Sequence, residues 1–156
     1  MALEIVSLEH LPNSHKVYVA LFRDVQNSAF LHQQLLARNP QFEYAFIDAS
    51  VIADAYRRYG ISPSTKDLIV VKVTFPGEDG AEPLTQDQIW EHLKTNVEGE
   101  ALPITDDQIS STTDVPKVRK YYKLNGLKWL DDIKDEKVKQ KEMESLVISA
   151  MALRGV

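Results

Sequence analysis

The chain has 156 residues, of which 44% are hydrophobic and 26% charged, a length and composition that suit one globular domain with its own core. It contains no cysteine, which excludes a disulfide framework, a thiolate nucleophile, an iron–sulfur cluster and a cysteine-based zinc site. Its net charge of −5 argues, taken alone, against a generic nucleic-acid coat protein.

The first half of the chain is predicted to combine strands with short helices. Strands are expected over residues 3–8, 16–22, 43–47 and 68–75. The second of these is almost continuously apolar, which is typical of a central strand. Asp24 is the expected N-cap of a helix that stops at Asn39-Pro40, and Gly60 is expected to end a short helix over residues 52–59.

The second half is predicted to be mainly helical. Two patterns, Thr85-x-x-Gln88 and Thr105-x-x-Gln108, each favour the start of a helix, because such residues cap a first turn. Thr113 is the expected cap of a basic helix over residues 114–124, and Asn125-Gly126 is expected to turn.

The last helix is expected from residue 135 or 136 to Arg154, with Gly155 closing it, while residues 127–134 favour neither helix nor strand. Strands and helices follow one another without a clean alternation. The sequence therefore predicts an α/β protein of the α+β type: a single domain over residues 1–156, with a mixed sheet flanked by helices.

The acidic excess is concentrated in one block. Residues 76–114 hold ten acidic residues and one base, Lys94, so the remaining chain is mildly basic. The chain starts without a secretory-signal pattern, and no stretch approaches the roughly 20 apolar residues of a membrane span. We therefore expect a protein of the nucleus and cytoplasm that has no membrane partner.

No constellation typical of an enzyme is present. The four histidines show no metal-ligand spacing, and the sequence has neither a glycine-rich phosphate loop nor a Gly-x-Ser-x-Gly elbow. The paired carboxylates Asp106-Asp107 and Asp131-Asp132 lie in charged stretches, and adjacent helix residues do not face each other. We expect a non-enzymatic protein with no catalytic residues, cofactor or metal.

The final helix is predicted to be apolar nearly all round in its last turns. At 100° per residue its core side comprises Met143, Leu146, Val147, Ala150 and Leu153. Ile148 and Ala152 fall on the opposite side, and Met151 lies next to Val147. An apolar outer side indicates a partner surface, a helix enclosed within its own fold, or a single exposed isoleucine of the kind that is normal on a protein surface.

The helix before it is basic. Lys117, Arg119, Lys120 and Lys123 surround two tyrosines in the stretch from Pro116 to Leu124. In such a stretch the basic side chains can bind phosphates and the aromatic rings can stack on nucleobases. A solvated basic face is, however, the commoner reason for such a pattern.

Six segments, taken together, resemble one family, the small kinase-binding subunit of the KEOPS (EKC) complex. The segments are Leu21–Asn27, Phe46–Asp48, Ile52–Ile61, Leu68–Val71, Val115–Leu124 and Leu153–Val156. The resemblance implies a subunit without its own activity that binds and stimulates a small atypical kinase/ATPase. It also implies a role in presenting tRNA, by its 3′ end, for synthesis of threonylcarbamoyladenosine beside the anticodon. Some members of the family are linked to telomere maintenance.

The resemblance also implies the site residues. The family's kinase contact uses the C-terminal helix, which points to Val147, Ile148, Met151 and Ala152 in this chain. The tRNA role suits Lys117, Arg119, Lys120 and Lys123. Other KEOPS subunits are expected as indirect partners. The alternative is a stand-alone module that binds tRNA 3′ ends, and an enzyme of unrecognised type lacks any supporting residues.

One departure from the family concerns an internal segment. Its members carry a further helix, a basic stretch and a strand where Asp48 is here followed almost at once by Ala53, so several tens of residues are missing near residues 49–53. A shortened protein, an altered gene product, or a loop omitted from the numbering would each produce this pattern. A true deletion is expected to remove a strand and RNA-facing bases and to leave the C-terminal surface intact.

Overall fold

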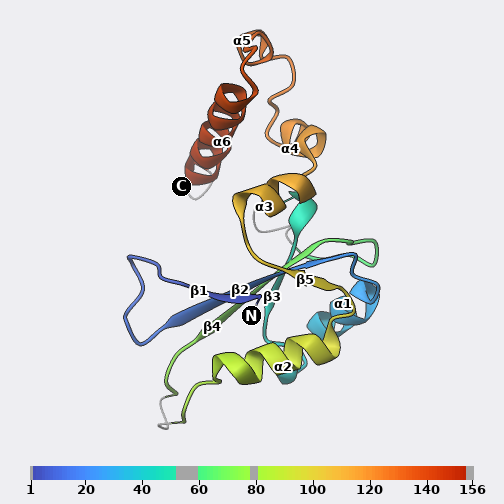
Figure 1. Ribbon diagram of the computed structural model, residues 1–156, viewed down its shortest axis with the longest axis vertical. Coiled ribbons are helices and arrows are strands. Elements are labelled where there is room, and N and C mark those ends of the chain that lie inside the picture. Colours follow the sequence, from blue (N-terminus) through green and yellow to red (C-terminus); the bar gives the residue numbers. More distant parts are fainter. Residues whose placement is uncertain (1, 52–59, 78–80, 154–156) are drawn as a thin grey trace.

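The computed structural model describes residues 2–51, 60–77 and 81–153, and Figure 1 shows the arrangement of their elements. The strands are β1 (Leu3–Val6), β2 (Lys16–Arg23), β3 (Ala45–Asp48), β4 (Leu68–Thr74) and β5 (Glu100–Leu102). The α-helices are α1 (Ser28–Leu36), α2 (Gln86–Asn96), α3 (Asp106–Thr112), α4 (Val115–Tyr121), α5 (Lys128–Asp131) and α6 (Glu136–Leu153). Two short 3₁₀ turns, η1 (Pro40–Phe42) and η2 (Ala49–Val51), flank β3.

The strands form one five-stranded sheet in the order β1-β2-β4-β3, and β5 pairs with the far end of β2. Every strand pair in the described residues is antiparallel, which differs from the mixed sheet expected. The reason is topological. β2 and β3 run in the same direction on either side of β4, so the crossover through α1 joins strands that are not neighbours. The α+β class is confirmed.

The main core lies between one face of the sheet and the helices α1 and α2, which Figure 1 shows together beside the sheet. Its largest fully buried side chains include Phe22, Leu31, Leu68 and Leu93. The capping box predicted at Thr85 is confirmed, since Thr85 Oγ1 accepts from Gln88 N and the Gln88 side chain accepts from Thr85 N. A smaller cluster around Leu21, Ala49 and Ile69 lies on the other face of the sheet.

The helices α4, α5 and α6 extend away from the sheet, with α3 between them and the strands (Figure 1). Their own apolar cluster is built around Val118, Tyr122 and Leu124. Hydrogen bonds tie this helical region to the sheet region: Asp114 N donates to the Ser50 carbonyl at 3.1 Å, Lys117 Nζ donates to Ser50 Oγ at 3.4 Å, and an Arg23 guanidinium nitrogen donates to Ser111 Oγ at 2.9 Å.

Two predicted caps are wrong. Asp24 does not cap α1, because it adopts a left-handed backbone (φ +50°) and the helix begins only at Ser28. Thr113 does not cap α4, because the side chain of Asp114 accepts the hydrogen bond from Lys117 N instead. The strand β5 was also missed.

Helix α5 and the turns η1 and η2 were not predicted either. The remaining elements agree with the prediction to within a few residues at their ends, including the central place of β2 and the turn at Gly126, whose φ is +88°. The predicted helix over residues 52–59, the junction near residue 52, and the closing Arg154 and Gly155 lie outside the described residues.

Candidate partner-binding surface

Helix α6 begins with a side-chain cap at Asp135, and the rest of the protein covers only part of its surface. Asp135 Oδ1 accepts from the backbone N–H groups of Lys137 and Val138, at 2.9 and 3.2 Å, which caps the first turn. None of the 18 residues of α6 is buried. Four of them, Met143, Leu146, Val147 and Ala150, pack against the apolar cluster of α4. The predicted core side is therefore confirmed for these four residues and wrong for Leu153, which is 75% exposed.

The opposite side of α6 is open to solvent. Ile148 is 66% exposed and Met151 is 40% exposed, and Ala152 beside them is also exposed. The alternative that α6 is enclosed within its own fold is thus excluded by the structure. Helix α6 therefore presents large apolar side chains to solvent on this side.

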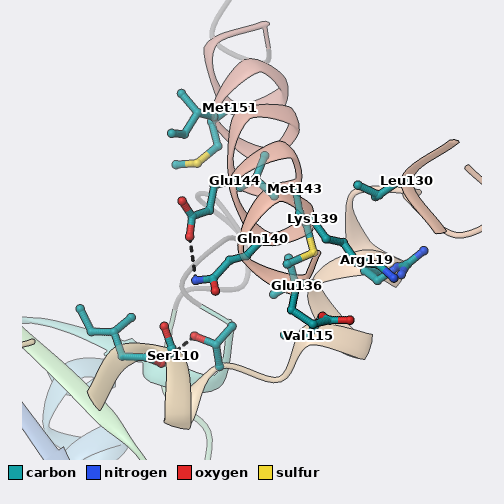
Figure 2. Close-up of a pocket in the computed structure, with 15 residues that line it drawn as sticks. Ser110, Val115, Arg119, Leu130, Glu136, Lys139, Gln140, Met143, Glu144 and Met151 are labelled. Carbon is teal, nitrogen blue, oxygen red and sulfur yellow. Dashed lines mark hydrogen bonds between the residues drawn. The ribbon is translucent and has the colours of Figure 1, made fainter. Parts of the chain in front are cut away.

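A groove of about 710 Å³ runs between α6 and the helices α3 and α4. The lining residues of α3, α4 and α5, with the C-cap Thr113, are Ile109, Ser110, Thr113, Val115, Val118, Arg119 and Leu130. The lining residues of α6 are Glu136, Lys139, Gln140, Met143, Glu144, Val147, Ile148 and Met151. Figure 2 shows Met151, Glu144 and Gln140 on one wall, with Ser110 across the groove from them.

Three of the four predicted kinase-binding residues, Val147, Ile148 and Met151, line this groove, and Ala152 is exposed beside it. The opposite wall, with Ile109, Ser110 and Val115, was not predicted. The capping pattern at Thr105 indicated the helix that carries two of these residues, yet helical spacing does not show which helix packs beside which.

The four bases predicted to bind RNA have different surroundings. Arg119 is mostly buried; it donates to Asp131 Oδ1 in an ion pair that joins α4 to α5, and to the Leu124 carbonyl at 3.4 Å. Lys117 Nζ lies 3.4 Å from Ser50 Oγ on η2. Lys120 and Lys123 are exposed, and Lys123 follows the helix in a left-handed conformation with φ of +56°.

A separate polar pair lies at the edge of the main core. Tyr44 Oη is 2.9 Å from His92 Nδ1, and this contact links the residue just before β3 to α2. Burial raises the pKa of Tyr44 to about 12, and burial together with the positive charge of Lys72 lowers the pKa of His92. Among the described residues no group of three or more histidine, aspartate or glutamate side chains is placed to hold a metal ion, and no helix there is long and apolar enough to cross a membrane.

Comparison with known proteins gives a match over nearly the whole chain. The model of the family described as "Kinase binding protein CGI-121" matches residues 22–55 and 50–155. A protein of Gibberella zeae named "EKC/KEOPS complex subunit CGI121" is 71% identical over 197 aligned positions that cover all of both chains. Its counterpart in Neurospora crassa is 41% identical over 207 positions, again covering all of both, and one in Schizosaccharomyces pombe is 23% identical with 90% of this chain covered.

The comparisons also bear on the missing segment. Because the Gibberella zeae alignment has 197 positions and this chain has 156 residues, at least 41 positions have no residue here. The family match breaks into two stretches that meet at residues 50–55. The prediction of an internal segment missing near residues 49–53 is thereby confirmed. With a family model and high-identity relatives in agreement over this length, the chain belongs to the CGI-121 family of kinase-binding proteins.

Proposed function

We propose that this protein is the non-catalytic subunit of a KEOPS (EKC) complex that binds and stimulates the small atypical kinase/ATPase subunit through α6. The observation that carries this proposal is the exposed apolar side of a terminal helix, with Ile148 and Met151 at its centre. The family description and the names of the relatives support a kinase partner and a KEOPS complex. Stimulation follows if α6 binds the active arrangement of the kinase more tightly than the inactive one.

The experiment compares binding of the kinase subunit to wild type, Ile148→Arg and Met151→Arg by calorimetry or pull-down. An unpaired charge placed in a desolvated contact is expected to cost about 3 kcal/mol or more, which is a loss of affinity of about a hundredfold. Val138→Arg is a matched control, because Val138 is an exposed aliphatic residue on the same helix that does not line the groove. Folded variants of Ile148 and Met151 that bind as tightly as wild type would refute the proposal.

We further propose that the protein helps to present tRNA for threonylcarbamoylation of the adenosine beside the anticodon, acting in nucleus and cytoplasm and, within the complex, in telomere maintenance. The exposed bases Lys120 and Lys123 support the tRNA contact, since exposed ammonium groups attract phosphates. The charge of the whole chain does not oppose it, because the acidic excess lies in residues 76–114, before α4. A stand-alone module for tRNA 3′ ends is the alternative, and it requires tight binding by the free protein.

A further inference from the structure

The turn that joins α4 to α5 (Figure 1) contains Asn125-Gly126, a dipeptide that occurs once in the chain. Both residues are exposed, and the Gly126 φ of +88° is a left-handed conformation that favours glycine. Apart from its chain neighbours, no atom lies within 4 Å of the position that a Cβ on Gly126 would take. The fold therefore requires glycine at this position and leaves its backbone open to the asparagine side chain before it.

No hydrogen bond restrains either residue of this dipeptide. Within the described part of the chain, neither the Asn125 side-chain amide nor the Gly126 N–H has a hydrogen-bond partner. The residues on either side are held: Leu124 N donates to the Arg119 carbonyl at 2.8 Å, and the Leu127 carbonyl accepts from Leu130 N at 3.0 Å. Two unrestrained residues thus connect two anchored ones.

We propose that Asn125 is a site of spontaneous deamidation in the folded protein, and that its isoaspartate product loosens the connection between α4 and α5. In the first step the Gly126 N attacks Asn125 Cγ. The N–Cγ bond forms, the Cγ–Nδ2 bond breaks, and ammonia leaves with the proton of the Gly126 N–H. Water then adds to either carbonyl of the resulting succinimide ring and opens it, which gives aspartate or isoaspartate at position 125. Water is the sole co-reactant, and nothing is oxidised or reduced. Glycine favours ring closure because it has no Cβ to crowd the ring.

The other four asparagines of the chain lack this combination of features. Asn39 precedes a proline, which has no N–H to react. Both polar atoms of the Asn27 side chain are hydrogen bonded to backbone groups, at 2.8 and 3.1 Å, and Asn96 Nδ2 donates to a carbonyl of its own helix at 2.8 Å. Asn13 is exposed in a turn but precedes Ser14, whose Cβ crowds the ring. Asn13 is therefore the internal comparison for Asn125.

The isoaspartate product changes the length of the turn. Its main chain runs through the former side chain, so one extra backbone atom lies between Leu124 and Leu127. Both of these residues pack in the apolar cluster of α4, and the Leu124 carbonyl also accepts from Arg119. Since Arg119 pairs with Asp131 on α5, a shift of either anchor weakens the contact between the two helices. The aspartate product adds the same charge without lengthening the main chain.

The first test measures the reaction in the full chain. The folded protein is incubated at mildly alkaline pH, and its tryptic peptides are followed by mass spectrometry for the gain of about 1 Da that deamidation causes. Asn125 is expected to react at least about tenfold faster than Asn13. Isoaspartate in the peptide over residues 124–128 is detected as an acceptor for isoaspartyl carboxyl methyltransferase. Equal rates at the two asparagines in the folded chain would show that the turn protects Asn125, and the proposal would be wrong.

Asn125→Gln is the control variant for the reaction. The φ of Asn125 is not in the left-handed region, so glutamine fits there without backbone strain. Its longer side chain closes a larger ring, and this closure is slower. The variant is therefore expected to lose the isoaspartate signal from residues 124–128 and to retain the slow reaction at Asn13. An isoaspartate signal in this peptide that equals that of wild type would overturn the assignment to Asn125.

The second test measures the structural consequence. The isoaspartate fraction of incubated wild type is separated by ion exchange and compared in urea unfolding with incubated Asn125→Gln and with Asn125→Asp. The midpoint of the isoaspartate fraction is expected to fall by roughly 0.5 M, and the midpoints of both variants by less than about half of that. An unchanged midpoint would refute the loosening of the turn, and an equal fall in Asn125→Asp would assign the effect to charge instead. Neither test uses the kinase subunit or tRNA, so the result is independent of the proposed function.

Discussion

Replacement of Arg119 by alanine tests whether this side chain stabilises the fold or binds RNA. The Arg119 side chain is 19% exposed and pairs with Asp131, whose side chain is 46% exposed. It also donates to the Leu124 carbonyl, so it holds α4, the turn after it and α5 together. This arrangement predicts that Arg119→Ala destabilises the fold, and that any effect on tRNA binding is a consequence of that change.

The magnitude follows from the exposure of the two partners. Because Asp131 is about half exposed, solvent screens the ion pair, and its coupling energy is expected to be about 0.5–1 kcal/mol. The largely covered stem of Arg119 loses packing in addition, so the free energy of unfolding is expected to fall by about 1–2 kcal/mol in Arg119→Ala. Lys120→Ala, at an exposed position on the same helix, is expected to change it by less than about 0.5 kcal/mol.

The assay is a double-mutant cycle by urea unfolding on wild type, Arg119→Ala, Asp131→Ala and the double variant. A coupling energy of zero would mean that the ion pair contributes nothing in solution. If Arg119→Ala also left stability unchanged and lowered tRNA affinity as much as Lys120→Ala does, the structural role assigned to Arg119 would be refuted. Arg119→Lys is expected not to restore full stability, because an ammonium group does not reproduce the planar guanidinium contacts.

Two further predictions concern charge. Combining Lys120→Ala with Lys123→Ala is expected to lower tRNA affinity and to reduce the slope of log affinity against log salt by about 2, measured by filter binding; an unchanged slope would show that neither lysine contacts phosphate. His92 has a lowered pKa in the folded state, so the unfolded chain binds more protons just below its ordinary value of 6.5, and stability is lost as pH falls through that region. His92→Gln is expected to flatten this part of the pH dependence in urea unfolding, and a pH dependence identical to wild type would contradict the assignment.

Local signals in the sequence predicted most of the fold. The capping box at Thr85 and the apolar run of β2 and β4 are contained in short stretches, and each was found. The strand β5 was missed because three residues give no periodicity, and its strand conformation depends on pairing with β2, about 80 positions away in the sequence. The predicted helix cap at Asp24 is wrong for a related reason. A left-handed residue is fixed by the contacts around it, and aspartate tolerates either conformation.

The candidate site was predictable on one wall only. Helical spacing places Ile148 and Leu146 on different sides of α6, and the structure agrees, because Ile148 is exposed and Leu146 is packed. The wall that carries Ser110 depends on where α3 lies relative to α6, which no spacing within a single helix encodes. The same limit explains why Arg119 was grouped with the exposed lysines, since its partner Asp131 lies on another helix.

The antiparallel pairing of β3 with β4 has a consequence for chain length. The break in the family match at residues 50–55 falls in the connection between these two neighbouring strands. Adjacent antiparallel strands need no minimum crossover, and the entropy of closing a loop changes only slowly with its length. Removal of some forty residues there leaves the register of β3 on β4 attainable, whereas an equal loss between β2 and β3 would consume the whole crossover through α1. The β3–β4 connection therefore accommodates this difference in length while the two strands stay paired.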